Sequence, residues 1–346
     1  MRLAPALLFL VLPAATDARA EDTPAYEIAC RRWAEVAIPL QDTRTATVGC
    51  DSRLLYYGRD GEGLRLDYVA ARHCAYAERA ASGDKHSPFG GSDTAFGGSG
   101  MLMMIYANGR GVERNLPLAR RFACEYGGAP MEVESRLHHL DALAKGAGQT
   151  PFDLCDDVTS GMMMGFCAGR DGDFAATRRD SRWTALQSSW TPTQREALAT
   201  LRAKAKIHFD HVSREETDMS GTMRGVFATE AFEALDRTLL DDIARFEAGE
   251  RPAQKAADFA RVDKALNEEY RKTLAKLDAG KAHDGFGEYG TIAPEGVRTA
   301  QRSWLRYRDA WLRFAAARWP KTPADAWKAW LMTERTQALR ALVQAP

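Results

Sequence analysis

Histidines, paired carboxylates and methionine runs are the residues of this chain whose types and spacing could do chemistry. His208 and His211 flank Asp210 and could begin a metal site. Zinc needs three or four ligands, and no third ligand motif accompanies these two, so the surface of an amphipathic helix is the simpler explanation. The runs Met101–Met104 and Met162–Met164 could attract a soft metal, but methionine more often fills gaps in helix packing. We therefore expect no metal and no other cofactor.

The carboxylate pairs raise the possibility of glycoside hydrolysis. Asp241-Asp242 and Glu268-Glu269 each lie among the charged positions of an amphipathic pattern. A glycosidase needs two carboxylates that face each other across a cleft, which adjacent residues on a solvated helix face do not provide. The sequence also lacks a Gly-x-Ser-x-Gly elbow and a Walker-type phosphate loop. We predict that the chain is not an enzyme.

The first twenty residues have the features of a secretory signal peptide. Arg2 gives a basic start, Leu7–Leu12 is apolar but too short to span a bilayer, and Ala18-Arg19-Ala20 forms a cleavage site before Glu21. No later stretch of about 18 apolar residues follows. We expect a periplasmic or secreted protein of a Gram-negative bacterium, with no membrane anchor in its mature form.

The cysteines fit this export. They are Cys30, Cys50, Cys74, Cys124, Cys155 and Cys167. An even number of cysteines behind a signal peptide indicates three disulfides formed in an oxidising compartment. All six precede residue 168, so the rest of the chain must be held together by packing alone.

The charge balance limits the partners. Lysine plus arginine and aspartate plus glutamate number 47 each, and 45% of the residues are hydrophobic. Phosphate backbones select strongly basic faces, so this composition argues against a nucleic-acid-binding protein. A local basic patch remains compatible with it.

A sequence phrase occurs twice at a spacing of 48 residues. The complete copy, Tyr106–Phe122, places glycines 109 and 111 between two apolar segments, and Gly61–Ala71 repeats it. Glycine permits the positive φ of a tight turn, and a fixed period in this range is typical of stacked helical hairpins. The phrase resembles the Sel-one-like repeats, relatives of the tetratricopeptide repeat. The resemblance implies a scaffold of stacked α-hairpins over residues 21–148, of the kind used for protein contacts.

The same hairpin resemblance suggests a disulfide pattern. In such a hairpin the start of the first helix lies beside the end of the second, which would bring Cys50 near Cys74. Cys155 and Cys167 are close in sequence, which leaves Cys30 and Cys124 as the third pair. The sequence alone permits other connectivities.

Beyond the linker at residues 147–152, amphipathic helices follow one another. Ala300, Trp304, Tyr307, Trp311 and Phe314 recur at steps of four and three, which predicts a helix with one buried aromatic face. Arginines 302, 306 and 313 fall on the other side, where solvated charges belong. We expect the two tryptophans to be core residues.

Two parts of this region share a plan. A capping box at Thr191-Pro192-Thr193-Gln194 starts a helix whose apolar stripe, shifted by 99 residues, falls on that of the 297–311 segment. We interpret residues 153–250 and 251–346 as two diverged three-helix units. The predicted fold is therefore all-α, with stacked helical hairpins followed by two such units.

The second unit resembles the LprI-like lysozyme inhibitor family. The family pattern is an A-D-x-x-L-N-x-x-Y helix followed by A-Q-R-x-W-L-x-F/Y-R-D-A. The matching residues here are Leu266, Asn267, Tyr270, Gln301, Arg302, Trp304, Arg308 and Asp309. Members usually carry a cysteine soon after the second motif, where this chain has Trp311. We expect Arg308 and Asp309 to bond to neighbouring helices, for example to Asn267 or to a helix end, because adjacent residues do not meet across a helix turn.

The resemblance implies a protein partner, namely a lysozyme-type muramidase. An inhibitor would have to fill the cleft that holds the catalytic carboxylates. The candidate partner loop is the glycine-rich segment 281–290, with Lys281, His283, Asp284 and Glu288. An ordinary connecting loop is the alternative for that segment. The alternative for the whole protein is a repeat-based interaction scaffold of the cell envelope.

Overall fold

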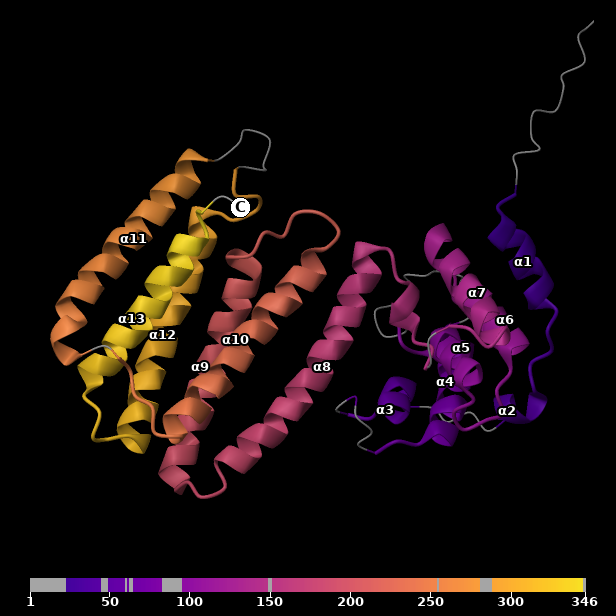
Figure 1. Ribbon diagram of the computed structural model, residues 1–346, viewed down its shortest axis with the longest axis horizontal. Coiled ribbons are helices and arrows are strands. Elements are labelled where there is room, and N and C mark those ends of the chain that lie inside the picture. Colours follow the sequence, from indigo (N-terminus) through magenta and orange to yellow (C-terminus); the bar gives the residue numbers. More distant parts are fainter. Residues whose placement is uncertain are drawn as a thin grey trace, which may run out of the picture.

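The fold is all-α, as predicted, and consists of two helical lobes joined by one long helix (Figure 1). This computed structural model describes residues 23–44, 49–59, 61, 65–82, 95–148, 151–253, 255–280 and 288–344. The expected signal peptide, residues 1–20, lies outside these ranges. In the described part of the chain, no helix has the length and apolarity needed to cross a membrane.

The first lobe contains seven helices within the described residues. They are α1 (Ala25–Ala34), α2 (Leu40–Arg44), α3 (Ser52–Tyr57), α4 (Tyr68–Ser82), α5 (Gly98–Asn108), α6 (Leu116–Tyr126) and α7 (Pro130–Ala144). Helix α5 is at the centre: every side chain from Met101 to Ala107 is buried, with α4 and α6 packed on either side. The MLMM run is thus core.

The copy at Tyr106–Phe122 forms the turn of the α5–α6 hairpin, and the described end of the other copy leads into α4. Asp67 and Asn115, at equivalent places of the two copies, each accept a hydrogen bond from the third backbone N–H that follows and so cap α4 and α6. Gly111 has φ 71°, and a Cβ there would lie 2.6 Å from the carbonyl carbon of Tyr68. Only glycine allows this turn to approach the start of α4 so closely.

Three disulfides cross-link the first lobe and its junction with the second lobe. They join Cys30 to Cys124, Cys50 to Cys74, and Cys155 to Cys167. These are the pairs that the hairpin resemblance and the order of the cysteines favoured. The first ties α1 to α6, the second ties the segment before α3 to α4, and the third ties η2 (Leu154–Asp157) to the next helix.

The second lobe has two sets of three helices in the same order. The first set is α8 (Gly161–Leu186), α9 (Pro192–Glu215) and α10 (Arg224–Glu247). The second is α11 (Phe259–Ala279), preceded by η3 (Ala256–Asp258), then α12 (Pro294–Arg318) and α13 (Ala324–Ala341). Helix α8 packs on α10, α11 packs on α13, and the central contact joins α9 to α12. This arrangement is compatible with the proposed pair of diverged units.

Aromatic side chains fill the core of the second lobe. Seven of the eight tryptophans lie in it, together with Phe246 and Phe314. Trp304 is 3% exposed and Trp311 is fully buried, which confirms the inward aromatic face predicted from the spacing. Burial of such a side chain stabilises a fold by about 1.5–3 kcal/mol, so packing can hold together this core, which contains no cysteine.

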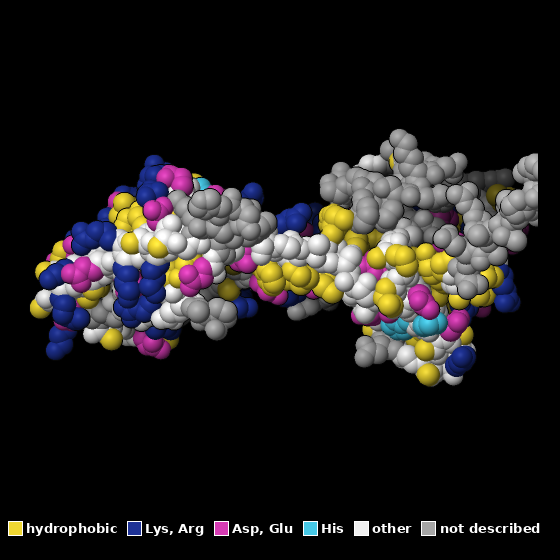
Figure 2. Space-filling view, turned by 90° about the horizontal axis from the view of Figure 1, so that it is seen from above, with side chains coloured by type: hydrophobic (Ala, Val, Ile, Leu, Met, Phe, Trp, Pro, Cys, Tyr) yellow, Lys and Arg dark blue, Asp and Glu magenta, His cyan; other side chains and the backbone are white. Residues whose placement is uncertain are grey.

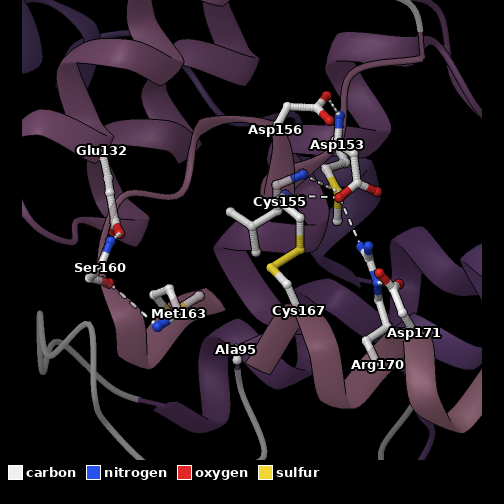
Figure 3. The surroundings of a disulfide bond; sticks show 12 residues. Ala95, Glu132, Asp153, Cys155, Asp156, Ser160, Met163, Cys167, Arg170 and Asp171 are labelled. Carbon is white, nitrogen blue, oxygen red and sulfur yellow. Dashed lines mark hydrogen bonds and ion pairs between the residues drawn. A yellow bond between two sulfur atoms is a disulfide. The ribbon is translucent and has the colours of Figure 1, made fainter. Parts of the chain in front are cut away.

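Helix α8 belongs to both lobes. Met163 and Cys167 near its start lie in the first core, whereas Trp183 near its end lies in the second. Arg170 donates to Asp153 Oδ1 at 2.8 Å and to the Tyr57 hydroxyl at 3.1 Å, which fixes α8 to the first lobe (Figure 3). Space-filling shows the narrow waist where this helix connects the lobes (Figure 2).

The other end of α8 is fixed to α10. Arg179 donates to both carboxylate oxygens of Glu233, at 2.5 and 2.9 Å, and to Asp236 at 2.7 Å. Nearer the waist, Gly165 lies against Gly225, so the two helices cross at close range. Because Met163 and Cys167 belong to the first core, that core extends past the predicted linker into α8.

Candidate functional site

The family-motif residues of α12 divide between its two sides. Trp304 faces the core, while Arg302 is exposed and donates to Glu295 Oε1 at 3.2 Å. Gln301 is partly exposed, and its side-chain oxygen accepts a hydrogen bond from Arg335 Nε at 2.8 Å. The motif thus supplies contacts to α13 as well as core volume.

Arg335 is the centre of a buried polar cluster. Its two terminal nitrogens donate to Glu216 Oε2 and Oε1 at 2.7 and 2.6 Å, and the two residues are only 3% and 6% exposed. Glu216 is the C-cap residue of α9, so the pair joins the end of the middle helix of the first set to the last helix of the second. Gln301 accepts from the remaining guanidinium nitrogen, Nε, so all three nitrogens of Arg335 are hydrogen-bonded.

Tyr307 and His208 form a second polar contact inside the α9–α12 interface. Their rings stack with centroids 5.4 Å apart, and the Tyr307 hydroxyl accepts from Trp311 Nε1 at 2.8 Å. The His208 ring nitrogen Nδ1 lies 3.2 Å from the Ser303 hydroxyl. Burial, together with the nearby Arg335 charge, lowers the pKa of His208 to about 3. Burial also raises the pKa of Tyr307.

His208 is therefore a neutral core residue, not part of a helix surface as the spacing suggested. Asp210 is instead paired with Arg214, at 3.0 Å. Among the residues that the structure describes, no group of three or more histidine, cysteine, aspartate or glutamate side chains is placed to hold a metal.

Arg308 and Asp309 pair with each other, contrary to the expectation. Arg308 donates from Nε and Nη2 to Asp309 Oδ1, at 3.0 and 2.8 Å. Neighbouring residues point in directions about 100° apart on a helix, but the long arginine side chain reaches around to its neighbour while its guanidinium covers the Trp304 ring. Asn267 is not involved, because its amide donates to Asp263 on its own helix.

The motif residues of α11 are also structural. Leu266 is buried, Tyr270 packs against the core, and Asn267 is exposed. The buried carboxylate here is Glu269, which Arg340 of α13 approaches at 3.3 Å. The sequence placed Glu269 among solvated charges, because its burial depends on where α13 packs.

The candidate partner loop lies largely outside the described residues. Lys281, His283 and Asp284 are not described, whereas Glu288 is exposed and its backbone N–H donates to the Gly280 carbonyl at 3.0 Å. Just beyond, the Thr291 N–H donates to Asp218 Oδ1 at 3.1 Å, and the Met219 N–H donates to the Thr291 hydroxyl at 2.7 Å. The base of the loop is thus held against the α9–α10 connection.

Asp218 is the anchor of this loop base. Hydrogen bonds from the Ser220 hydroxyl and from the backbone of Ser220 and Thr291 lower its pKa. Gly290, with φ 62°, lies against the same carboxylate, where any side chain would clash. Both connections lie at the same end of the second lobe (Figure 1). No local signal links Asp218 with Thr291, because the contact joins two different three-helix sets.

Comparison with known proteins agrees with the resemblance in the last part of the chain. Residues 248–341 match the family described as Lysozyme inhibitor LprI. This range holds the α11–α13 set and every family-motif residue discussed above. No curated protein matches the chain, and no solved structure matches it either. The chain is therefore similar to the lysozyme inhibitor LprI family over its last three helices.

Proposed function

We propose that the mature chain is a periplasmic or secreted, non-enzymatic binding protein that inhibits a lysozyme-type muramidase. The observation that carries this proposal is the similarity of residues 248–341 to the LprI lysozyme inhibitor family. The three disulfides support an oxidising compartment. Gln301 of α12 and Glu269 of α11 contact Arg335 and Arg340 of α13, so these polar groups hold helices together, which supports a binding role over a catalytic one.

Inhibition would require the protein to cover the muramidase cleft. Muramidases place two carboxylates on either side of the scissile bond, and a rigid projection that enters the cleft excludes the glycan. The loop from Lys281 to Gly290 is the candidate projection, because its base at Glu288 and Thr291 is anchored to the rest of the lobe. An anchored base reduces the entropy lost when a loop binds.

The test is a muramidase activity assay with the purified mature protein. The rate at which a lysozyme-type muramidase clears a suspension of cell walls should fall as the protein is added. A variant in which residues 281–287 are replaced by glycine and serine, at unchanged length, should inhibit less if the loop enters the cleft. Full muramidase activity at a large excess of the wild-type protein would reject the function.

A repeat-based scaffold is the second candidate function. We propose that residues 21–148 form Sel-one-like repeats, supported by the stacking of α3–α4 on α5–α6 and by the equivalent caps Asp67 and Asn115. Affinity capture from the native envelope, with a first-lobe fragment extended through Phe174, would test it. Partners that bind this fragment, together with an absence of muramidase inhibition, would favour the scaffold.

A further inference from the structure

The charge of the chain is separated between the two three-helix units. Residues 153–250 contain 18 acidic and 12 basic residues, a net charge of −6. Residues 251–346 contain 11 acidic and 18 basic residues, a net charge of +7. The overall neutrality of the chain therefore hides a basic unit, and this unit is the part that is similar to the inhibitor family.

Helices α9 and α12 carry cations on a shared side, where Lys204 is half-buried and Arg306 and Arg313 are exposed. They are antiparallel, because Gln194 donates to the Ala317 carbonyl at one end while His208 meets Ser303 further along. This register places Lys204 of α9 level with Arg306 of α12. Arg306 and Arg313 are exposed and lie on the side of α12 away from Trp304 and its contacts. We call Lys204, Ile207, Arg306 and Arg313 the outer face.

The cations of the outer face have no carboxylate partner. Arg298, Arg302, Arg308 and Arg318 on the same helix each pair with an acidic residue. Among the described residues, no carboxylate lies within ion-pair distance of Lys204, Arg306 or Arg313, and the nearby Asp309 is bound by Arg308. Ile207 adds an apolar side chain that is 45% exposed.

We propose that the outer face, rather than the loop at residues 281–290, is the surface that contacts the muramidase cleft, with Arg306 and Arg313 directed at its carboxylates; this inference rests on the proposed function. Seven residues of helix separate the two arginines by about 10 Å. The two carboxylates of a glycosidase lie about 5–10 Å apart, a span that two long arginine side chains can match. Guanidinium groups bind carboxylates through paired hydrogen bonds, and desolvation in a cleft strengthens them.

The experiment compares two charge-matched double variants of the mature full-length protein. Arg306→Gln/Arg313→Gln removes the cations of the outer face. Arg271→Gln/Lys321→Gln removes two exposed cations that also have no carboxylate partner among the described residues. Glutamine keeps helix propensity, and circular dichroism and the melting temperature confirm folding. The outer-face variant should need at least about tenfold more protein for half-inhibition, and the control less than about twofold.

A second measurement identifies the carboxylates. The affinities of the wild-type protein and of both variants are measured for two enzymes. One is the muramidase, and the other is the same muramidase with its catalytic acid changed from Glu to Gln. Non-additive losses between this change and the outer-face change would place the arginines beside that carboxylate, and additive losses would overturn the assignment.

The remaining outcomes separate the inference from the function on which it rests. If the wild-type protein inhibits and both double variants inhibit equally well or equally poorly, the outer-face assignment is wrong and the function stands. If the wild-type protein does not inhibit, both are wrong. If the wild-type protein sediments with cell walls in the absence of muramidase and the outer-face variant does not, the face binds an anionic glycan, which also overturns the inference.

Discussion

Glu216 and Arg335 form a buried ion pair between the end of α9 and the middle of α13, 119 residues apart in sequence. Both side chains are almost completely removed from solvent. Two charges in such a place stabilise the fold only together, because either one alone would be desolvated without compensation. The packing of α13, the last helix, therefore depends on Glu216 at the end of α9.

Removing one member of this pair should destabilise the second lobe strongly. We expect Arg335→Met to lower the free energy of unfolding by about 3–5 kcal/mol, because Glu216 is left as a buried and unpaired charge. Arg298→Met is the control, because Arg298 and its partner Glu295 are both exposed and the loss of this pair should cost less than about 1 kcal/mol. Urea unfolding followed by tryptophan fluorescence measures both. The double variant Glu216→Leu/Arg335→Met should recover most of the loss; equal losses in the single and double variants would contradict this account.

His208 should make the fold sensitive to acid. Its pKa is about 3 in the folded state against 6.5 when unfolded, because burial disfavours the imidazolium. The unfolded chain therefore binds a proton that the folded chain does not, and stability present above pH 6.5 is lost as the pH falls from there toward 3. The slope of this contribution is about 1.4 kcal/mol per pH unit.

The measurement compares unfolding free energies at pH 7 and pH 5. Wild-type protein should lose more stability over this interval than His208→Gln, whose side chain cannot be protonated. His138→Gln, at an exposed position, should follow the wild type. If His208→Gln and wild type show the same change between the two pH values, the imidazole does not remain neutral in the folded state.

Asp242 should change the stability in the opposite direction to His208, because acid stabilises its folded form. Burial, only partly offset by Arg245, raises its pKa to about 6. The folded state thus binds the proton more readily than the unfolded chain, so stability present near pH 4 is lost as the pH rises through 6. The shift corresponds to at most about 3 kcal/mol. Asp242→Asn should be more stable than wild type at pH 7.5 and similar to it near pH 4, whereas exposed Asp241→Asn should show no such dependence. Destabilisation by Asp242→Asn at pH 7.5 would show that the Arg245 contact outweighs the burial of charge.

Reduction of the disulfides should unfold the first lobe and leave the second lobe folded. All three disulfides lie in the first lobe and its junction, and a disulfide contributes about 3–5 kcal/mol when it closes loops of these lengths. Seven of the eight tryptophans lie in the cysteine-free core. Dithiothreitol should therefore lower the helix signal in circular dichroism while the tryptophan emission maximum stays near its native value. A simultaneous loss of both signals would mean that the second lobe depends on the first.

The features that the sequence could predict are those set by local periodicity. The steps of three and four through Ala300, Trp304 and Trp311 predict a buried helix face, because only one side of a helix can meet a core. The cap at Thr191 likewise follows from a side chain that bonds to the next turn. The pairing of Cys50 with Cys74 followed from the geometry of one hairpin.

The features that the sequence could not predict depend on distant helices. Glu216 and Arg335 each look like ordinary surface charges, and nothing near either one indicates a partner more than a hundred residues away. Glu269 and His208 are buried only because α13 and α12 pack over them. The Arg308–Asp309 pair was missed for a different reason, since the directions of adjacent residues were considered without the reach of the arginine side chain.

The last prediction concerns the boundary between the lobes, which the sequence placed at the linker of residues 147–152. In the structure the first core includes Phe152, Leu154, Met163 and Cys167. A fragment of residues 21–148 would therefore expose the apolar surface that these side chains cover, and would lack Asp153 and Arg170, which bond to the Tyr57 hydroxyl. We expect this fragment to unfold at lower temperature than a fragment of residues 21–175, or not to fold at all.

The longer fragment restores several interactions at once. It contains the Cys155–Cys167 disulfide and the contacts of Arg170 with Asp153 and Tyr57. Burial of the added apolar side chains stabilises by about 1.5–3 kcal/mol each, and the short disulfide loop adds about 3 kcal/mol. Thermal unfolding of the two fragments, with 21–175 carrying Arg170→Met as a control, separates these contributions. If residues 21–148 melt as cooperatively and at the same temperature as residues 21–175, then α8 is not a structural part of the first lobe and the boundary lies where the sequence placed it.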